Sequence, residues 1–132
     1  MDTLFKTVGE IQKGNTFFAH EDSSALEVAS QLVNSRYTGM PVVDKKNRVI
    51  GIVSEQDILK AFRGSKQLKE IKIKNIMTSP PIVIKEDTTL EAASKILEDQ
   101  YIQRLPVVKD GILIGTITRH DLIRAWIGLP PS

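Results

Sequence analysis

The stretch GIVSEQDIL, residues 51–59, indicates that the chain contains an internal repeat, because the similar stretch GTITRHDLI follows 64 residues later at positions 115–123. Both stretches carry the pattern Gly-x-x-Ser/Thr-x-x-Asp. In each, an apolar, β-rich run turns into a polar segment with helical spacing. A strand-to-helix turn that occurs twice at such a distance is typical of a repeated structural unit.

The similarity extends upstream of both stretches. Pro-Val-Val at 41–43 recurs at 106–108, and SALEVAS at 24–30 resembles TTLEAAS at 88–94. In this alignment the second copy gains one residue near Arg104 and loses one in the following turn. The predicted organisation is one module, residues 1–132, made of repeat 1 (8–63), a linker (64–72) and repeat 2 (73–127).

Each repeat predicts the order strand, helix, strand, strand, helix, which places the chain in the mixed α/β class. A lead-in helix is expected from Thr3 to about Gln12. The pairs Ser24 with Glu27 and Thr88 with Glu91 have the spacing of capping boxes at the start of the first long helix. The residues expected on the buried faces of these helices are Leu26, Ala29, Leu32 and Val33 in repeat 1, and Leu90, Ala93, Ile96 and Leu97 in repeat 2.

Composition narrows the class of protein. The chain has no cysteine, which excludes a disulfide framework and a cysteine metal site. Its 18 basic and 16 acidic residues are interleaved, whereas a nucleic-acid binder usually shows a basic stripe. No apolar run approaches the ~20 residues that span a bilayer. The start of the chain lacks a signal-peptide pattern, so no membrane association and a cytoplasmic location are expected.

The repeated turn offers chemistry suited to a nucleotide. Free backbone N–H groups at a helix start attract phosphate, and the hydroxyl of Ser54 or Thr118 adds a donor. The carboxylate of Asp57 or Asp121 can accept two hydrogen bonds from a ribose diol. The alternative interpretation is structural, because Ser/Thr-x-x-Asp at a helix start is also an ordinary N-cap.

Catalysis is not expected. The sequence shows no Ser/His/Asp set, no Walker-type glycine loop and no acidic cluster suited to Mg²⁺. His20 and His120 have no companions at metal-ligand spacing, so no metal site is expected. Phe62 and Trp126 end the two final helices and are expected to pack in the core or against a second copy of the chain.

The two copies together resemble the cystathionine-β-synthase (CBS) domain pair, also called the Bateman module. The resemblance covers about residues 8–127, and Ile76-Met77-Thr78 and IQRLPVV at 102–108 are especially typical. It implies two interlocked α/β units about a pseudo-two-fold axis, with two clefts that bind AMP, ADP, ATP or S-adenosylmethionine. It also implies a regulatory role, a homodimer, and a separate, unidentified protein that reads the ligand-bound state.

The resemblance implies the following nucleotide-binding residues. In repeat 1 they are Thr16, Phe18, Tyr37, Thr38, Gly39, Met40, Pro41, Ser54, Gln56 and Asp57. In repeat 2 they are Thr78, Pro81, Ile82, Ile102, Gln103, Arg104, Leu105, Pro106, Thr118, His120 and Asp121. Asp57 and Asp121 are expected to hold ribose, Ser54 and Thr118 to lie near phosphate, and the strand starts to form an apolar slot for adenine.

The repeats differ in charge. Arg104 stands where repeat 1 has Gly39, and Arg119-His120 stands where repeat 1 has Glu55-Gln56. Because charge-assisted bonds to phosphate are strong, the Asp121 site is expected to take the more highly charged nucleotide. The leading function is an adenine-nucleotide sensor. The alternatives are an S-adenosylmethionine sensor, a ligand-free interaction scaffold, and a nucleic-acid-binding role that the balanced charge does not favour.

Overall fold

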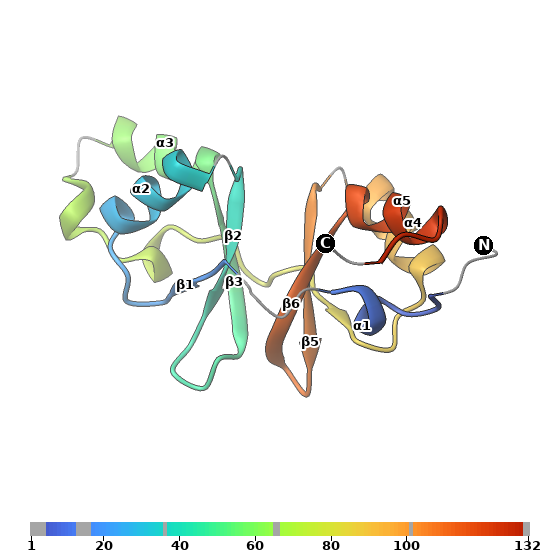
Figure 1. The fold of residues 1–132 in the computed structure, drawn as a ribbon. Helices are drawn as coiled ribbons and strands as arrows, with labels where there is room; N and C mark the ends of the chain where they lie inside the picture. Colours follow the sequence, from blue (N-terminus) through green and yellow to red (C-terminus); the bar gives the residue numbers. More distant parts are fainter. Residues whose placement is uncertain (1–4, 13–16, 36, 65–66, 101, 131–132) are drawn as a thin grey trace. The chain divides into compact units, whose positions relative to one another are not determined.

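The computed structural model describes residues 5–12, 17–35, 37–64, 67–100 and 102–130. The chain forms two compact units, each named for the aspartate of its Gly-x-x-Ser/Thr-x-x-Asp motif (Figure 1). The Asp57 unit comprises residues 17–81, and the Asp121 unit comprises residues 1–16 and 82–132. Each unit has its own cluster of buried hydrophobic side chains.

In the Asp57 unit, α2 and α3 lie side by side on one side of a three-stranded sheet (Figure 1). Its elements are β1 (Ala19–His20), α2 (Ala25–Ser35), β2 (Gly39–Val43), β3 (Val49–Ser54), α3 (Glu55–Arg63), and the 3-10 turns η1 (Leu68–Glu70) and η2 (Ile73–Asn75).

The Asp121 unit repeats this arrangement, with α4 and α5 on one side of its sheet (Figure 1). Its elements are α1 (Val8–Ile11), β4 (Ile84–Lys85), α4 (Leu90–Asp99), β5 (Arg104–Lys109), β6 (Ile112–Thr118) and α5 (Arg119–Trp126). The predicted order strand, helix, strand, strand, helix is therefore confirmed in both repeats, and the fold is mixed α/β.

Both sheets place a proline in the middle strand. In the Asp57 unit the order is β1-β2-β3, and the short β1 pairs in parallel with only Val42 and Val43 of β2. Pro41 therefore has no paired residue in β1, while on the other side it lies opposite Ile52 of β3, a position in the sheet where a missing N–H is tolerated. Pro106 has the same position, because β4 pairs only with Val107 and Val108.

The lead-in segments are exchanged between the repeats. The predicted lead-in helix is short: α1 covers only Val8–Ile11, and Thr3 lies outside the described residues. Val8 and Ile11 are buried in the hydrophobic cluster of repeat 2, and the Val8 N–H donates to the Thr88 carbonyl at 2.9 Å. Ile73, which begins repeat 2, is buried in the cluster of repeat 1. Each unit thus needs a segment from the other repeat, so the two repeats are interlocked.

The first long helix of each repeat shows that the alignment of the two repeats predicted from the sequence is off by one residue in this region. The capping box of Ser24 and Glu27 is confirmed, with the Glu27 N–H 3.1 Å from the Ser24 hydroxyl. In repeat 2 the predicted box of Thr88 and Glu91 is wrong, because Thr89 is the N-cap and its side chain accepts from the Ala92 N–H at 3.1 Å. The helices therefore correspond 65 residues apart, not 64.

The same shift of one residue explains which side chains are buried. Ala25, Val28 and Leu32 face the core in α2, as Leu90, Ala93 and Leu97 do in α4. The prediction that Leu26 and Val33 are buried is wrong: they are 47% and 78% exposed. The difference of 65 residues holds through β2 and β5 and returns to 64 after the hairpin turn. The copies therefore differ there by one residue, and none is inserted near Arg104.

Candidate functional site

The repeated Gly-x-x-Ser/Thr-x-x-Asp pattern forms the turn from β3 into α3. Ser54 ends the strand with extended backbone (φ −120°, ψ 168°) and is the N-cap of the helix. Its hydroxyl accepts from the Asp57 N–H at 3.3 Å, and Oδ2 of Asp57 accepts from the Ser54 N–H at 2.8 Å. This reciprocal pair satisfies two N–H groups at the helix start, so the structural interpretation of the motif is correct.

The cap leaves the second carboxylate oxygen of Asp57 for another partner. Oδ2 also accepts from the Ser54 hydroxyl at 3.1 Å, whereas Oδ1 accepts from the Thr78 hydroxyl at 3.4 Å. Thr78 reaches this position through a short antiparallel bridge, in which its N–H and carbonyl pair with Ile52 at 2.8 and 2.9 Å. Capping therefore uses Oδ2, while Oδ1 contacts a side chain that comes from the other repeat.

Gly51 allows the lead-in of repeat 2 to approach β3. A Cβ at this position would lie 2.5 Å from the Met77 sulfur and 3.1 Å from the Thr78 carbonyl oxygen. The first glycine of the motif thus has a packing role, since the backbone next to it carries the residue that meets Asp57.

The Asp121 turn has nearly the same geometry. Thr118 is the N-cap of α5 (φ −124°, ψ 169°) and its hydroxyl accepts from the Asp121 N–H at 3.2 Å. Oδ2 of Asp121 accepts from the Thr118 N–H at 2.8 Å and from its hydroxyl at 3.0 Å. Both acids are half-buried, so each turn presents a fixed carboxylate near the start of a helix.

Arg104 distinguishes the Asp121 turn. It lies opposite Thr118 in the β5–β6 pairing, and its Nη1 donates to the Thr116 hydroxyl at 3.0 Å. In the Asp57 unit the corresponding positions are Gly39, opposite Ser54, and the apolar Ile52. A Cβ on Gly39 would lie 2.9 Å from the Val53 carbonyl oxygen, so a side chain there requires the backbone to shift.

Sequence reasoning missed Thr116. It is the only buried polar residue in the described part of the chain, at 8% exposed, and it holds a predicted phosphate-binding side chain. The signal that could have found it is strand alternation, because a residue two positions before Thr118 points to the same face of β6.

The other predicted residues have varied surroundings. Met40 and Leu105 belong to the hydrophobic clusters, and Pro41 and Pro106 are also buried, so these four can contribute mainly backbone to a site. The half-buried residues are Phe18, Tyr37, Gly39, Pro81 and Ile102, and the exposed ones are Thr38, Gln56, Thr78, Ile82, Gln103 and His120. Thr16 lies outside the described residues.

Two of these residues join aromatic pairs. The ring of Tyr37 meets that of Phe17 edge to face at 4.9 Å, and the ring of Phe18 meets that of His20 at 5.5 Å. Thr38 lies at the Asp57 turn, since its carbonyl accepts from the Glu55 N–H at 2.9 Å. The apolar wall expected in repeat 1 is therefore aromatic, whereas Ile82 and Ile102 make its counterpart in repeat 2 aliphatic.

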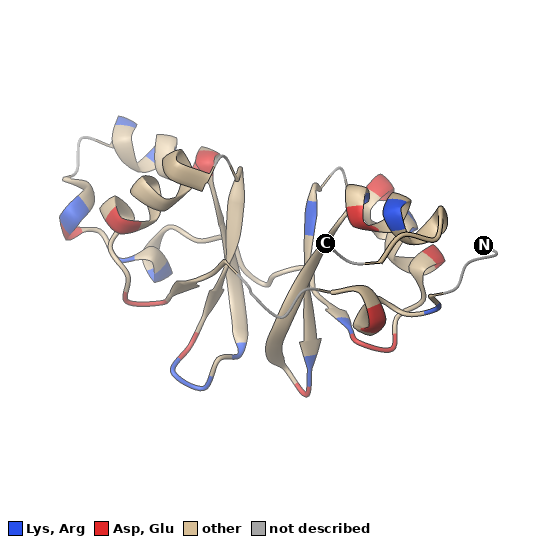
Figure 2. Cartoon of the chain, viewed as in Figure 1, with Lys and Arg blue, Asp and Glu red and all other residues tan. Residues whose placement is uncertain are grey.

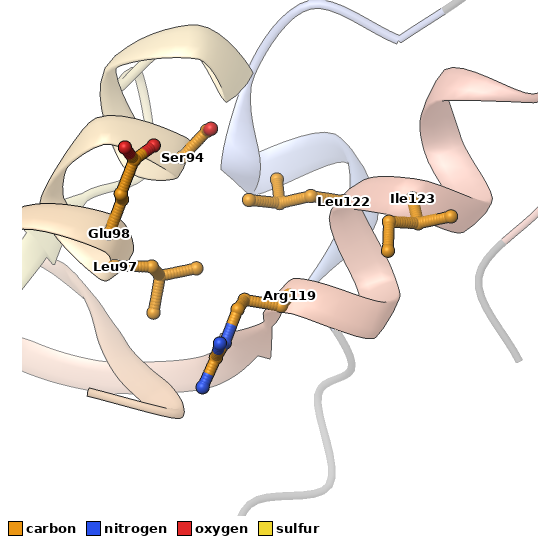
Figure 3. Close-up of a pocket in the computed structure, with 6 residues that line it drawn as sticks. All are labelled: Ser94, Leu97, Glu98, Arg119, Leu122 and Ile123. Carbon is orange, nitrogen blue, oxygen red and sulfur yellow. The ribbon is translucent and has the colours of Figure 1, made fainter. Parts of the chain in front are cut away.

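A separate groove of about 460 Å³ lies between α4 and α5 (Figure 3). Leu97, Leu122 and Ile123 provide apolar side chains, and Glu98 and Arg119 place one charge of each sign at its border. Asp121 does not line this groove, so the groove is distinct from the candidate nucleotide site.

In the described residues, charged side chains of one sign do not cluster, and no group of side chains has the composition of a metal site. Lysine and arginine positions alternate with aspartate and glutamate positions in both units (Figure 2). Within the described ranges, no three His, Cys, Asp or Glu residues gather as a metal site would require. Every helix in the described part of the chain is too short or too polar to cross a bilayer.

Comparisons with known proteins agree with this architecture. The CBS domain family model matches residues 8–64 and 73–128. The CBS domain-containing protein CBSX1, chloroplastic, of Arabidopsis thaliana is 32% identical over 156 residues, which cover 96% of this chain and 66% of CBSX1. The chain therefore spans about two thirds of that relative.

Two solved structures share both fold and sequence. CBSX2 in complex with AMP has a TM-score of 0.79 and 30% identity, covering 93% of this chain and 97% of that one. The CBS domain pair of protein MJ0100, in complex with 5-methylthioadenosine and S-adenosyl-L-methionine, has a TM-score of 0.74 and 28% identity, covering 89% and 93%. With two matched repeats and this fold, the chain is a tandem CBS domain pair and belongs to the CBS domain family.

Proposed function

We propose that this chain is a regulatory module that binds an adenine nucleotide, AMP, ADP or ATP, at the Asp57 and Asp121 turns. The observation that carries the proposal is the repeated use of one carboxylate oxygen, Oδ2, for the helix cap. In the Asp57 turn this leaves Oδ1 directed at an exposed hydroxyl, which a ribose hydroxyl can replace. The AMP held by the similar CBSX2 supports the choice of ligand class.

The two turns are proposed to differ in the charge of the nucleotide that each prefers. Arg104 brings a guanidinium to the strand end beside Thr118, whereas Arg119, the first residue of α5, lines the groove between α4 and α5. The Asp57 turn has Gly39 and Glu55 at these positions. Because a positive side chain strengthens bonds to phosphate, the Asp121 site binds the more highly charged nucleotide.

A thermal-shift panel with AMP, ADP, ATP, S-adenosylmethionine, NAD and GTP tests the proposal. A ligand at 100 times its Kd adds about 2.7 kcal/mol of stability, which raises the unfolding midpoint measurably. Loss of a cap lowers the midpoint of Asp57→Ala and Asp121→Ala without any ligand, so the decisive quantity is the ligand-induced rise within each variant. A rise with adenine nucleotides that disappears in the double variant supports the proposal.

The same panel separates the alternatives. A rise with S-adenosylmethionine alone favours the sensor that the MJ0100 complex suggests. The absence of a rise with every compound contradicts ligand sensing and favours an interaction scaffold. The proposed role is binding without catalysis, which release of ADP or phosphate from ATP by the purified chain would contradict. Affinity for nucleic acid that falls steeply with salt would support the nucleic-acid role.

A second copy of this chain is the proposed structural partner, and a separate protein is the proposed reader of the ligand state. Val33, Phe62, Ile123 and Trp126 are all more than half exposed on the helices, so Phe62 and Trp126 are not core residues. The groove between α4 and α5 has Arg119 and Glu98 at its border. A two-fold axis through such a groove places each charge opposite its complement on the other copy. The expected location remains the cytoplasm.

A further inference from the structure

The chain turns back on itself after α5. Gly128 has φ +86°, a conformation that only glycine adopts easily, and its N–H donates to the Ala125 carbonyl at 3.1 Å. The Leu129 N–H then donates to the Arg124 carbonyl at 2.9 Å. This ending directs the following residues back along the helix, where Figure 1 shows the dark-red end of the described chain.

Arg124 holds the returning segment in place. Its Nη2 donates to the Pro130 carbonyl at 2.8 Å and its Nε to the same oxygen at 3.3 Å. A guanidinium that reaches one carbonyl with two N–H groups gives a charge-assisted contact with a fixed direction. Residues 127–130, called the strap below, are therefore tied to α5 by both backbone and side-chain bonds.

The strap lies beside Asp121. Leu129 shares with Asp121 a small space that is otherwise lined by Ile11, Arg124 and Ala125. Asp121, Arg124 and Ala125 lie on one face of α5 because they are three and four positions apart. The space that remains between these side chains is too small to hold a water molecule, so the strap leaves no room for a ligand there. Leu129 therefore occupies the side of Asp121 that faces Ile11.

Repeat 1 ends its last helix differently. Gly64, the counterpart of Gly128, has φ −74°, and its N–H donates to the Lys60 and Ala61 carbonyls. The residue after it is Ser65, where the strap has Leu129, and the counterpart of Arg124 is Lys60. Among the described residues, the positive φ at the glycine and the arginine bonds to a following carbonyl occur in repeat 2 and not in repeat 1.

We infer that the strap is an autoinhibitory element that lowers nucleotide affinity at the Asp121 turn and leaves the Asp57 turn unaffected. The inference rests on the proposed function, because it assumes that Asp121 binds a nucleotide. Binding and strap closure compete for the same space. A regulator that released the strap would then raise affinity at only one of the two turns.

The test uses AMP and isothermal titration in the Asp57→Ala background, where only the Asp121 turn remains to be titrated. Arg124→Gln removes the guanidinium that binds the Pro130 carbonyl. Leu129→Ser replaces the apolar side chain with serine, the residue at the corresponding position 65 of repeat 1. Arg124→Gln is expected to lower the Kd for AMP by about five- to tenfold, the scale of one lost charge-assisted contact. Leu129→Ser is expected to lower the Kd as well, because the side chain beside Asp121 becomes smaller. Lys60→Gln is the matched control at the corresponding position of α3, and its Kd is expected to equal that of the background.

Hydrogen exchange gives a readout that does not depend on affinity. Arg124→Gln is expected to speed exchange of the Leu129 amide without AMP, and AMP is expected to speed it in the Asp57→Ala background. AMP binding of equal or weaker affinity in both strap variants overturns the inference and leaves the proposed function standing. Failure of AMP and every other nucleotide to bind any variant or the unaltered chain overturns the proposed function, and the inference with it.

Discussion

The hydroxyl of Thr78 donates to Oδ1 of Asp57 across 3.4 Å, while Oδ2 of the same carboxylate caps α3. The two residues come from different repeats and meet because the lead-in of repeat 2 pairs with β3 of repeat 1. One acid thus stabilises a helix start and contacts an exchanged segment. The helix cap alone explains why an aspartate occurs at this position of the repeated motif. The proposed function adds a role for the other oxygen, Oδ1, as the acceptor for a ribose hydroxyl.

The cap at Ser54 makes a measurable contribution to stability. Replacing Ser54 with alanine removes the acceptor for the Asp57 N–H and is expected to cost about 1 kcal/mol, or about 3 °C in Tm. Glycine at the same position costs only a few tenths of a kcal/mol, because the backbone is then freer to solvate the helix end. Thermal unfolding of both variants provides the measurement. Equal losses for Ser54→Ala and Ser54→Gly would contradict the capping role.

The close approach at Gly51 predicts an overpacking effect. Gly51→Ala places a methyl group 2.5 Å from the Met77 sulfur and 3.1 Å from the Thr78 carbonyl, and is expected to destabilise by about 1–3 kcal/mol. Part of this loss comes from Met77, so the Gly51→Ala/Met77→Ala double variant should lose less than the two single losses combined. Urea unfolding of the three variants tests the coupling, and simple additivity would exclude it.

Arg104 is expected to determine the preference for charge at the Asp121 turn. Arg104→Gln removes the guanidinium while keeping a polar side chain. The change is expected to weaken ATP binding about tenfold and AMP binding less, since ATP carries more phosphate charge. Thr116→Val tests the supporting hydrogen bond of 3.0 Å and is expected to produce a smaller loss. Titration calorimetry at two salt concentrations measures both, and equal losses for AMP and ATP would contradict the assignment.

Asp44 predicts a pH dependence of stability. Burial raises the pKa of its carboxyl, but the N–H groups of Arg48 and Lys46 and the Arg48 guanidinium together hold the pKa below its ordinary value. A pKa that is lower in the folded state adds stability above the unfolded pKa of about 3.9, and that stability is lost as pH falls through the lower folded value. Asp44→Asn should therefore have a lower Tm than the unaltered chain at pH 7.

The difference in Tm between the unaltered chain and Asp44→Asn should narrow as pH falls below about 4, because the unfolded chain takes up the proton first and the folded carboxylate follows only at its lowered pKa. Thermal scans across this range make the comparison. A difference that stays constant with pH would show that the carboxylate charge does not contribute.

The exposed apolar residues of the helices predict self-association. Trp126 and Phe62 are 61% and 69% exposed, so covering these large apolar side chains at an interface between two copies would favour association. The Phe62→Ser/Trp126→Ser variant is expected to sediment as a monomer at concentrations where the unaltered chain is a dimer. Lys95→Ser, an exposed charged position on α4, is the control and should remain a dimer. A monomeric unaltered chain would rule out the homodimer.

The sequence alone determined the repeat, the order of elements and the turn that ends at Asp57 and Asp121, because capping and strand-to-helix patterns depend on neighbours within a few residues. Only the tertiary structure decided the exact pairing of the copies. Thr88 and Thr89 are equally good caps, and burial of Ala25 and Val28 rather than Leu26 and Val33 depends on how α2 packs against its sheet.

Contacts between distant segments were also beyond the sequence. Three such contacts are the packing of Val8 in the core of repeat 2, the hydrogen bond from Arg104 to Thr116, and the position of Leu129 beside Asp121. The local sequence around one partner does not predict the other partner. Local preference fixes the elements, whereas the burial of apolar surface across the whole chain selects which elements meet.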